Sequence, residues 1–169
     1  VFGGVPVHVP VLRPSYHPDF EALEASVTEH TKARMLNSPN NPTGAVYTPQ
    51  EIQQIAAFAE KHDLWIFDDM IYSTLVYADH EYASPINSPG GEMRTITIGG
   101  WSKGWAMTGW RMGWITGPKG FMEAVKTCQA SAATHIPTFL MPAGEVALQL
   151  EKETKDMADS FAMRRIVMH

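Results

Sequence analysis

Apolar residues along the chain form short continuous runs, and longer segments with helical spacing separate these runs. Residues 64–67 and 95–98 are continuous apolar runs followed by Asp or Gly residues, which is typical of buried strands. Residues 33–37 form another short apolar run, and residues 5–11 are rich in valine between Gly and Pro residues, which predicts a strand. Strands that alternate with helices are characteristic of an α/β fold.

The segments between these runs carry the boundary residues of helices. Residues 19–30 place apolar side chains at helical intervals. The clearest helix start is at Thr48, the predicted N-cap. Pro49 would occupy the first helical position, and Glu51 would complete a capping box. We also expect a helix from Pro118 to about residue 132.

The second half of the chain predicts a change of strand direction and a long final helical segment. Too few residues separate Gly99 from Met112 for a crossover helix, so a strand over 112–116 is expected to run antiparallel to its neighbour. The sheet would therefore be mixed. Pro142 opens the last helical pattern, which continues over 143–169 with no glycine or proline stop near its end.

Composition and charge exclude several classes of protein. A chain of 169 residues, 44% of them hydrophobic, is long enough to bury one full core. The net charge is −5 and no basic run exceeds Arg164-Arg165, so we expect a small-molecule partner, with no nucleic acid and no membrane. The single cysteine, Cys128, and the lack of a secretory signal pattern favour the cytoplasm. The seven histidines show no spacing typical of a metal site.

Candidate chemical groups follow three of the predicted strands. Lys103 lies among small and aromatic residues, and an amine in apolar surroundings can become a nucleophile toward a carbonyl carbon. Asp69 and Tyr72 follow the 64–67 run, and Asn41 follows the 33–37 run. Each has a plain structural explanation on its own, as a surface lysine, a capping aspartate or an Asn-Pro turn. Together they stand where α/β folds place their binding sites.

These residues lie in motifs that resemble those of the class I and II aminotransferases, which are pyridoxal-phosphate-dependent enzymes of fold type I. The motifs are Pro39-Asn40-Asn41-Pro42-Thr43-Gly44, Asp69-Met70-Ile71-Tyr72 and the run from Ser102-Lys103 to Arg111-Met112-Gly113. The resemblance covers nearly the whole chain. It implies an α/β fold of three αβα layers around a mixed, mostly parallel sheet, of which this chain would be the central part of the large domain.

The resemblance implies specific roles at the reacting end of the cofactor. Lys103 would hold pyridoxal 5'-phosphate as a Schiff base and then shuttle a proton while an amino group passes between an amino acid and a 2-oxo acid. Asp69 would pair with the pyridine nitrogen and keep it protonated. Asn41 and Tyr72 would both hydrogen-bond the 3' oxygen of the ring.

The phosphate end of the site departs from the family pattern. Arg111 would bind the phosphate, for which a planar guanidinium is well suited. Family members commonly carry a serine three positions before the lysine as a phosphate ligand, whereas Gly100 stands there in this chain. Ser102, beside the lysine, is therefore expected to contribute less than Arg111. We interpret the four nearby tryptophans as packing this loop against the sheet; they are Trp101, Trp105, Trp110 and Trp114.

The resemblance also implies that essential parts lie outside this chain. Residues 1–142 would belong to the large pyridoxal-phosphate domain, and 143–169 would begin the helix leading to a C-terminal small domain. The glycine-rich phosphate turn and the residue stacking on the ring are expected before Val1, and the arginine for the substrate carboxylate after His169. We therefore expect a fragment that is inactive alone and belongs to a homodimer when full length.

Two alternatives to the aminotransferase interpretation remain open. The same fold and the same lysine, aspartate, tyrosine and arginine serve pyridoxal-phosphate-dependent carbon–sulfur lyases. Aminotransferase-like domains also occur as non-catalytic sensor domains of transcription regulators. A keto-acid product assay distinguishes a lyase from an aminotransferase. A helix-turn-helix segment encoded upstream of Val1 would favour the sensor domain.

Overall fold

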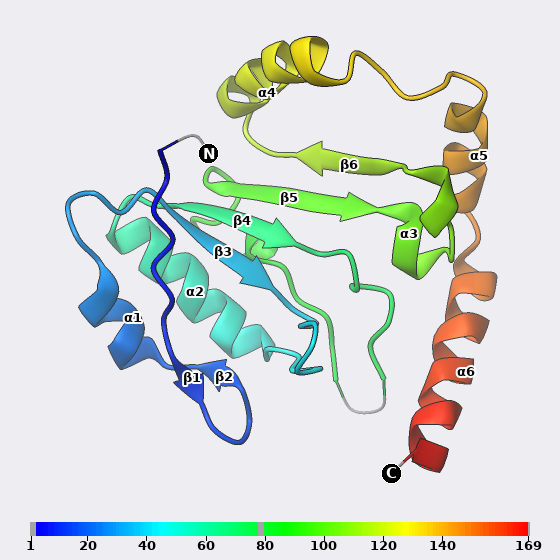
Figure 1. Cartoon of the computed structure of the whole chain (residues 1–169). Helices are drawn as coiled ribbons and strands as arrows, with labels where there is room; N and C mark the ends of the chain where they lie inside the picture. Colours follow the sequence, from blue (N-terminus) through cyan, green and yellow to red (C-terminus); the bar gives the residue numbers. More distant parts are fainter. Residues whose placement is uncertain (1–2, 78–79, 169) are drawn as a thin grey trace.

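The computed structural model describes residues 3–77 and 80–168, and a four-stranded sheet lies at its centre (Figure 1). The strands are hydrogen-bonded in the order β3, β4, β5 and β6. The first three are mutually parallel and β6 runs antiparallel to β5, so the predicted mixed sheet is confirmed. Their bounds are β3 (Ala33–Asn37), β4 (Trp65–Asp69), β5 (Thr95–Gly100) and β6 (Gly113–Thr116).

Helices connect the strands and extend the chain beyond the sheet. Their bounds are α1 (Phe20–Ser26), α2 (Pro49–Lys61), α3 (Trp101–Gly104), α4 (Lys119–Ala132), α5 (Leu140–Ala147) and α6 (Glu151–Met168), with short 3-10 helices η1 (Pro85–Asn87) and η2 (Thr108–Trp110). Among the described residues, no helix combines the length and apolarity needed to cross a membrane.

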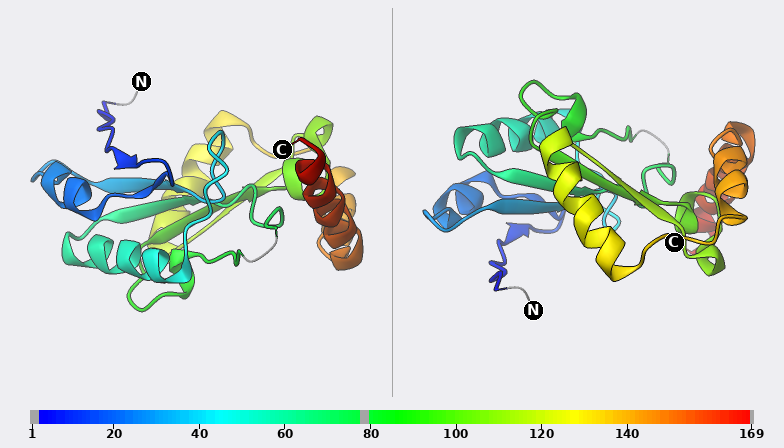
Figure 2. Two further views of the ribbon diagram at one scale, coloured as in Figure 1. Left: turned by 90° about the horizontal axis from the view of Figure 1, so that it is seen from below. Right: turned by 90° about the horizontal axis from the view of Figure 1, so that it is seen from above.

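The sheet has a helix layer on each face, because successive side chains of a strand point to opposite faces. In β4, Ile66 is buried on the side of α2 and joins the main core cluster. Its neighbours Trp65 and Phe67 point to the other side, where their rings lie 5.3 and 5.8 Å from the ring of Phe121 in α4. Figure 2 shows α2 and α4 on opposite sides of the strands. The predicted three-layer αβα architecture is confirmed.

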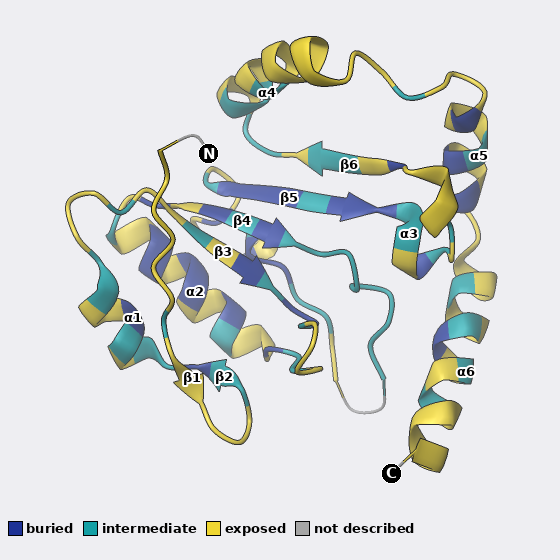
Figure 3. Ribbon diagram, in the orientation of Figure 1, coloured by how far each residue is buried: buried dark blue, intermediate teal, exposed yellow. Residues whose placement is uncertain are grey.

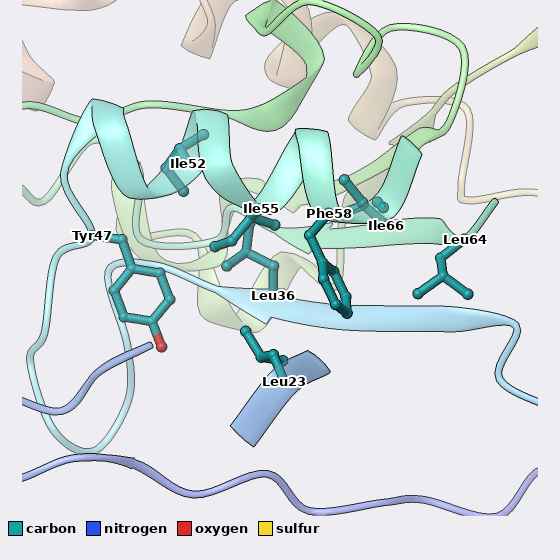
Figure 4. Packing of buried hydrophobic residues seen from close by; sticks show 9 residues of the cluster. Leu23, Leu36, Tyr47, Ile52, Ile55, Phe58, Leu64 and Ile66 are labelled. Atoms are coloured by element: carbon teal, nitrogen blue, oxygen red, sulfur yellow. The ribbon is translucent and has the colours of Figure 1, made fainter. Parts of the chain in front are cut away.

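Helix α2 begins where the sequence predicts. Thr48 accepts a hydrogen bond from the Glu51 backbone N–H, and the Glu51 carboxylate accepts one from the Thr48 backbone N–H at 2.7 Å. This capping box satisfies two donors that the first helical turn leaves unpaired. The helix then presents its apolar face to β3 and β4 (Figure 4). The core cluster comprises Leu23, Leu36, Tyr47, Ile52, Ile55, Phe58, Ala59, Leu64 and Ile66.

The strand predicted over residues 5–11 is largely wrong. Of residues 5–11, only Val11 lies in a strand, the two-residue β1 (Val11–Leu12), which pairs antiparallel with β2 (His17–Pro18). Val5 and Val7 are 85% and 67% exposed. A strand forms by pairing its backbone groups with a neighbour, which valine-rich composition alone does not supply. Helix α1 is also shorter than the 19–30 pattern, because Val27 already adopts an extended conformation.

The final helical segment divides into two helices instead of one. Helix α5 begins at Leu140, so Pro142 lies in its first turn, and α6 begins at Glu151. Between them, the N–H groups of Gln149 and Leu150 donate to carbonyls three residues earlier, which tightens the turn and ends α5. Residue 142 lies within α5, and the division into 1–142 and 143–169 stays a prediction. His169 and Val1 lie outside the described residues.

Candidate functional site

The candidate site lies at the carboxyl ends of three neighbouring parallel strands. Parallel strands start and finish at the same edges of a sheet, so segments that follow them meet in space. Asn37 and Asp69 are direct register partners at the ends of β3 and β4. The Asn37 amide donates to the backbone carbonyl of Asp69 at 3.2 Å and ties the two ends together.

Three of the predicted residues come together just beyond these strand ends. The Asn41 side-chain amide donates to the Tyr72 hydroxyl oxygen at 3.3 Å. The Lys103 Nζ atom lies 5.9 Å from the centre of the Tyr72 ring, within reach of a cation–π contact. The Asn41 backbone N–H donates to the Asn37 side-chain oxygen at 3.2 Å, which anchors the loop to β3. Tyr72 and Lys103, which follow Asn41 by 31 and 62 positions in the chain, thereby share one site with it.

Asp69 ends β4 and begins the turn that carries Tyr72. Its Oδ1 atom accepts a hydrogen bond from the Ile71 backbone N–H at 3.2 Å, and the Met70 N–H donates to the Ile98 carbonyl at 2.9 Å. The half-buried Asp69 also lines a cavity of about 410 Å³ together with Asn37. One carboxylate oxygen thus orders the turn, and no hydrogen bond within the described residues engages the other.

Glycines allow helix α3, which carries Lys103, to approach the residues around Tyr72 closely. A Cβ atom at Gly100 would lie 3.2 Å from the Ile71 side chain, and one at Gly104 would collide with the Thr74 hydroxyl. Helix α3, which follows Gly100 and ends at Gly104, carries Lys103. Residues with side chains at these two positions would push the lysine away from the segment that holds Tyr72.

The tryptophans pack around the same loop. The Trp101 and Trp114 rings meet edge to face with centres 4.7 Å apart, and Trp105 lies 6.0 Å from Trp114. The Trp101 indole N–H donates to the Gly144 carbonyl at 3.0 Å and joins α3 to α5. The predicted packing role is confirmed for these three rings. It is wrong for Trp110, which is 48% exposed.

The two residues predicted to hold a phosphate are less tightly organised. Ser102 is half-buried on α3 beside Lys103. Arg111 is exposed just after η2 with a left-handed backbone (φ 52°), and its guanidinium donates to the Thr108 carbonyl at 2.8 Å. Within the described residues no hydrogen bond joins either side chain to Lys103. The structure therefore places both in the lysine segment without showing a phosphate cradle.

One buried group near the site was not singled out from the sequence. Asp68 is 1% exposed, and the Ser84 hydroxyl donates to its Oδ2 atom at 2.5 Å. Burial raises the pKa of the Asp68 carboxyl to about 6, against the lowering effect of the Ser84 hydrogen bond. Strand alternation was the available signal, because Asp68 shares its face with the buried Ile66.

Comparison with known proteins identifies clear relatives. The family model described as aminotransferase class I and II matches residues 2–169. An aspartate aminotransferase of Streptomyces avermitilis is 43% identical over 136 residues, which are 79% of this chain and 33% of that protein. An aspartate aminotransferase of Pyrococcus abyssi is 38% identical over 167 residues, covering 96% of this chain and 43% of the relative.

Solved structures give the same result. The crystal structure of an aromatic aminotransferase from Pyrococcus horikoshii superposes with a TM-score of 0.93 at 37% identity, and the match covers 98% of this chain and 45% of that one. A Thermus thermophilus aspartate aminotransferase superposes with a TM-score of 0.83 at 34% identity, covering 95% and 41% of the two chains. The chain thus spans less than half the length of the relatives it matches.

Proposed function

The chain belongs to the class I and II aminotransferase family, and from that premise we propose that it forms part of an enzyme that transfers an amino group between an amino acid and a 2-oxo acid. Pyridoxal 5'-phosphate would be the cofactor and Lys103 its attachment point. The observation that carries the proposal is the Asn41 to Tyr72 hydrogen bond beside the Lys103 amine. These groups come from loops after two different strands and from α3.

The side chains present fit the functional groups of pyridoxal phosphate. Its aldehyde needs an amine, which is Lys103, and its ring oxygen needs neutral donors, which Asn41 and Tyr72 offer. Its ring nitrogen needs a carboxylate, and Asp69 has one oxygen outside the hydrogen bond to Ile71. When bound, the cofactor supplies an electron sink for the electron pair left on the substrate Cα atom.

Each residue then has a defined task in the proposed reaction. Lys103 would hold the cofactor through Nζ, and the same amine would take and return the proton of the substrate Cα. Asp69 holds a proton on the ring nitrogen, because its negative charge favours the cationic ring. Asn41 and Tyr72 donate to the ring oxygen and favour its anionic form.

The phosphate would be held by the remaining predicted residues. Arg111 follows the lysine segment and offers a planar, permanently charged fork. To reach a phosphate, its guanidinium would exchange the hydrogen bond to the Thr108 carbonyl for one to the ligand. Ser102 adds a hydroxyl beside Lys103, and we assign it the smaller contribution.

The first experiment tests cofactor attachment with a matched control. Purified protein is incubated with pyridoxal phosphate and scanned for the absorbance band of the lysine linkage. We expect the band in the parent and in Lys126→Ala, which removes an exposed lysine of α4, and we expect no band in Lys103→Ala. A band that persists in Lys103→Ala, or its absence from well-folded parent protein, contradicts the proposal.

The second experiment tests the reaction itself in the full-length protein. An amino acid and a 2-oxo acid are supplied together and both products are measured. Amino-group transfer forms a new amino acid and a new 2-oxo acid in equal amounts. Release of sulfide or a thiol together with ammonia and a 2-oxo acid from a sulfur-containing amino acid would instead favour a carbon–sulfur lyase.

A further inference from the structure

Asp68 presents a buried carboxylate on the face of the sheet opposite to Asp69. It stands one residue before Asp69 in β4, and its register partners are Leu36 in β3 and Thr97 in β5. Because strand side chains alternate, Asp68 points toward the α2 side while Asp69 points to the other side. Its hydrogen bond from the Ser84 hydroxyl at 2.5 Å joins it to a residue 16 positions later.

Ser84 stands where the chain returns to the sheet after leaving β4. It is 6% exposed and is the N-cap of η1. Its hydroxyl oxygen accepts a hydrogen bond from the Ile86 N–H, and its O–H donates one to Asp68. The next residue, Pro85, is buried as well. The hydrogen bond from Ser84 to Asp68 therefore ties the returning chain to β4.

This connection carries the residues that shape the lysine environment. We define residues 70–77 as the Tyr72 segment. It holds the Tyr72 hydroxyl against Asn41, and it holds Thr74 against the bare backbone of Gly104. Its first end is fixed by the Met70 N–H bond to Ile98. The described chain resumes at residue 80 and returns to the sheet at Ser84.

We propose that Asp68 is a positioning residue, whose buried hydrogen bond with Ser84 closes the connection after β4 and so keeps Tyr72 beside Asn41 and Lys103. The hydrogen bond between Asp68 and Ser84 is observed in the structure. Its importance for the reaction rests on the proposed function. Asp68 is not assigned a direct catalytic role, because its side chain is buried on the α2 side of the sheet while that of Asp69 points to the other side. It acts through the segment that Tyr72 belongs to.

The chemistry around Asp68 supports a role other than stability. Its titratable neighbours are Asp69 and Tyr82. The Asp69 charge raises the pKa of Asp68, whereas the Tyr82 hydroxyl lowers it. Burial together with the Asp68 charge raises the pKa of Tyr82. A carboxylate buried without a cation costs free energy that an apolar residue would avoid. Such a group is explained if its hydrogen bond holds a functional segment.

The test compares variants of the bond in the full chain. Ser84→Ala removes the donor, Ser84→Thr keeps a hydroxyl, and Asp68→Asn keeps the shape but removes the charge. Thr97→Val is the matched control, because it removes a buried hydroxyl whose partner is Thr116, 2.7 Å away, and not the returning chain. The first measurement is amide hydrogen exchange in peptides covering residues 70–77, without added cofactor.

The expected result is local to the Tyr72 segment. Ser84→Ala should raise its exchange by about tenfold, which is the effect of losing one charge-assisted hydrogen bond, while α2 peptides keep the parent rate. Asp68→Asn should give a smaller rise, and Ser84→Thr and Thr97→Val should match the parent. Parent-like exchange in both Ser84→Ala and Asp68→Asn would overturn the proposal. If Ser84→Ala does not fold, Asp68→Asn against Thr97→Val decides.

The second measurement separates positioning from a merely structural link. In protein loaded with pyridoxal phosphate, the Lys103-dependent band is titrated with alkali. A displaced Tyr72 donates less well to the ring oxygen, so Ser84→Ala should raise the pH at which the band titrates, and Ser84→Thr should restore it. Faster exchange with an unmoved titration would overturn the positioning role. If the parent shows no Lys103-dependent band, the proposed function fails, and the exchange comparison alone still decides whether Asp68 holds Tyr72.

Discussion

The two faces of the sheet carry helices of similar length but very different burial. Helix α2 buries five residues against β3 and β4, whereas none of the residues of α4 is buried. Figure 3 shows this contrast as a dark stripe along α2 and a largely exposed α4. The principal core cluster lies on the α2 side, with contributions from α1.

The difference teaches what an amphipathic pattern does and does not specify. Both helices place apolar residues on one side, which sets the side that faces the sheet. How much of that side is covered depends on the neighbours that surround it. On the α4 face, contact is concentrated in Phe121 between Trp65 and Phe67. The proposed site depends on loops at the strand ends, which the α2 face supports with its packed core.

The largest expected effect comes from removing a core side chain of α2. Ile55 is 0% exposed, so Ile55→Ala should lower the free energy of unfolding by about 4 kcal/mol through lost burial and an unfilled cavity. The matched change on α4 is Val125→Ala at a half-buried position, for which we expect about 1 kcal/mol or less. Urea unfolding of both variants measures the difference. Equal losses would show that the two faces contribute alike.

The second prediction concerns the buried charge on the α2 face. Burial raises the pKa of Asp68 from its ordinary value of 3.8 to about 6, so the folded chain holds this proton more tightly than the unfolded chain. The resulting stability is present below about pH 4 and is lost as the pH rises through about 6, a change of about 3 kcal/mol.

Asp68→Asn removes this titration and provides the reference. Urea unfolding of parent and variant at several pH values between 4 and 8 measures the difference in stability. We expect the parent to lose stability relative to Asp68→Asn as the pH rises across this interval, and to change little more above it. A difference that stays constant with pH would contradict the buried, protonatable carboxyl.

The smallest effect is expected where α5 meets the lysine loop. Trp101→Phe keeps an aromatic ring but removes the N–H that donates to the Gly144 carbonyl, which should cost about 1 kcal/mol. Trp110→Phe is the matched control at an exposed ring and should change the unfolding free energy by less than about 0.5 kcal/mol. Amide exchange in α5 should rise only in the first variant. Unchanged exchange there would show that packing alone holds α5.

The sequence predicted most reliably the features set by neighbouring residues. The capping box at Thr48 and Glu51 and the strands before Asp69 and Gly100 were found, because caps and apolar runs act over a few positions. The strand over 5–11 and the single helix after Pro142 were wrong. Pairing partners decide the first, and the break between α5 and α6 has no glycine or proline to signal it.

The candidate site divides in the same way. The motifs around Asn41, Asp69 and Lys103 pointed to their chemistry, but the hydrogen bond from Asn41 to Tyr72 exists only because parallel strands bring their ends together. The exposed position of Arg111 and the buried partner of Asp68 were not predictable from spacing. Both depend on side-chain directions that segments far away in the chain impose.

The amino-acid sequence by itself determined the α/β class, the mixed sheet and the family to which the chain belongs, because periodicity, caps and ordered motifs are properties of neighbouring residues. Only the tertiary structure decided which face of the sheet is tightly packed, which predicted site residues touch, and that the Asp68 side chain is buried on the α2 side of the sheet. Those outcomes depend on burial and on contacts between residues distant in the chain, and no local pattern carries that information.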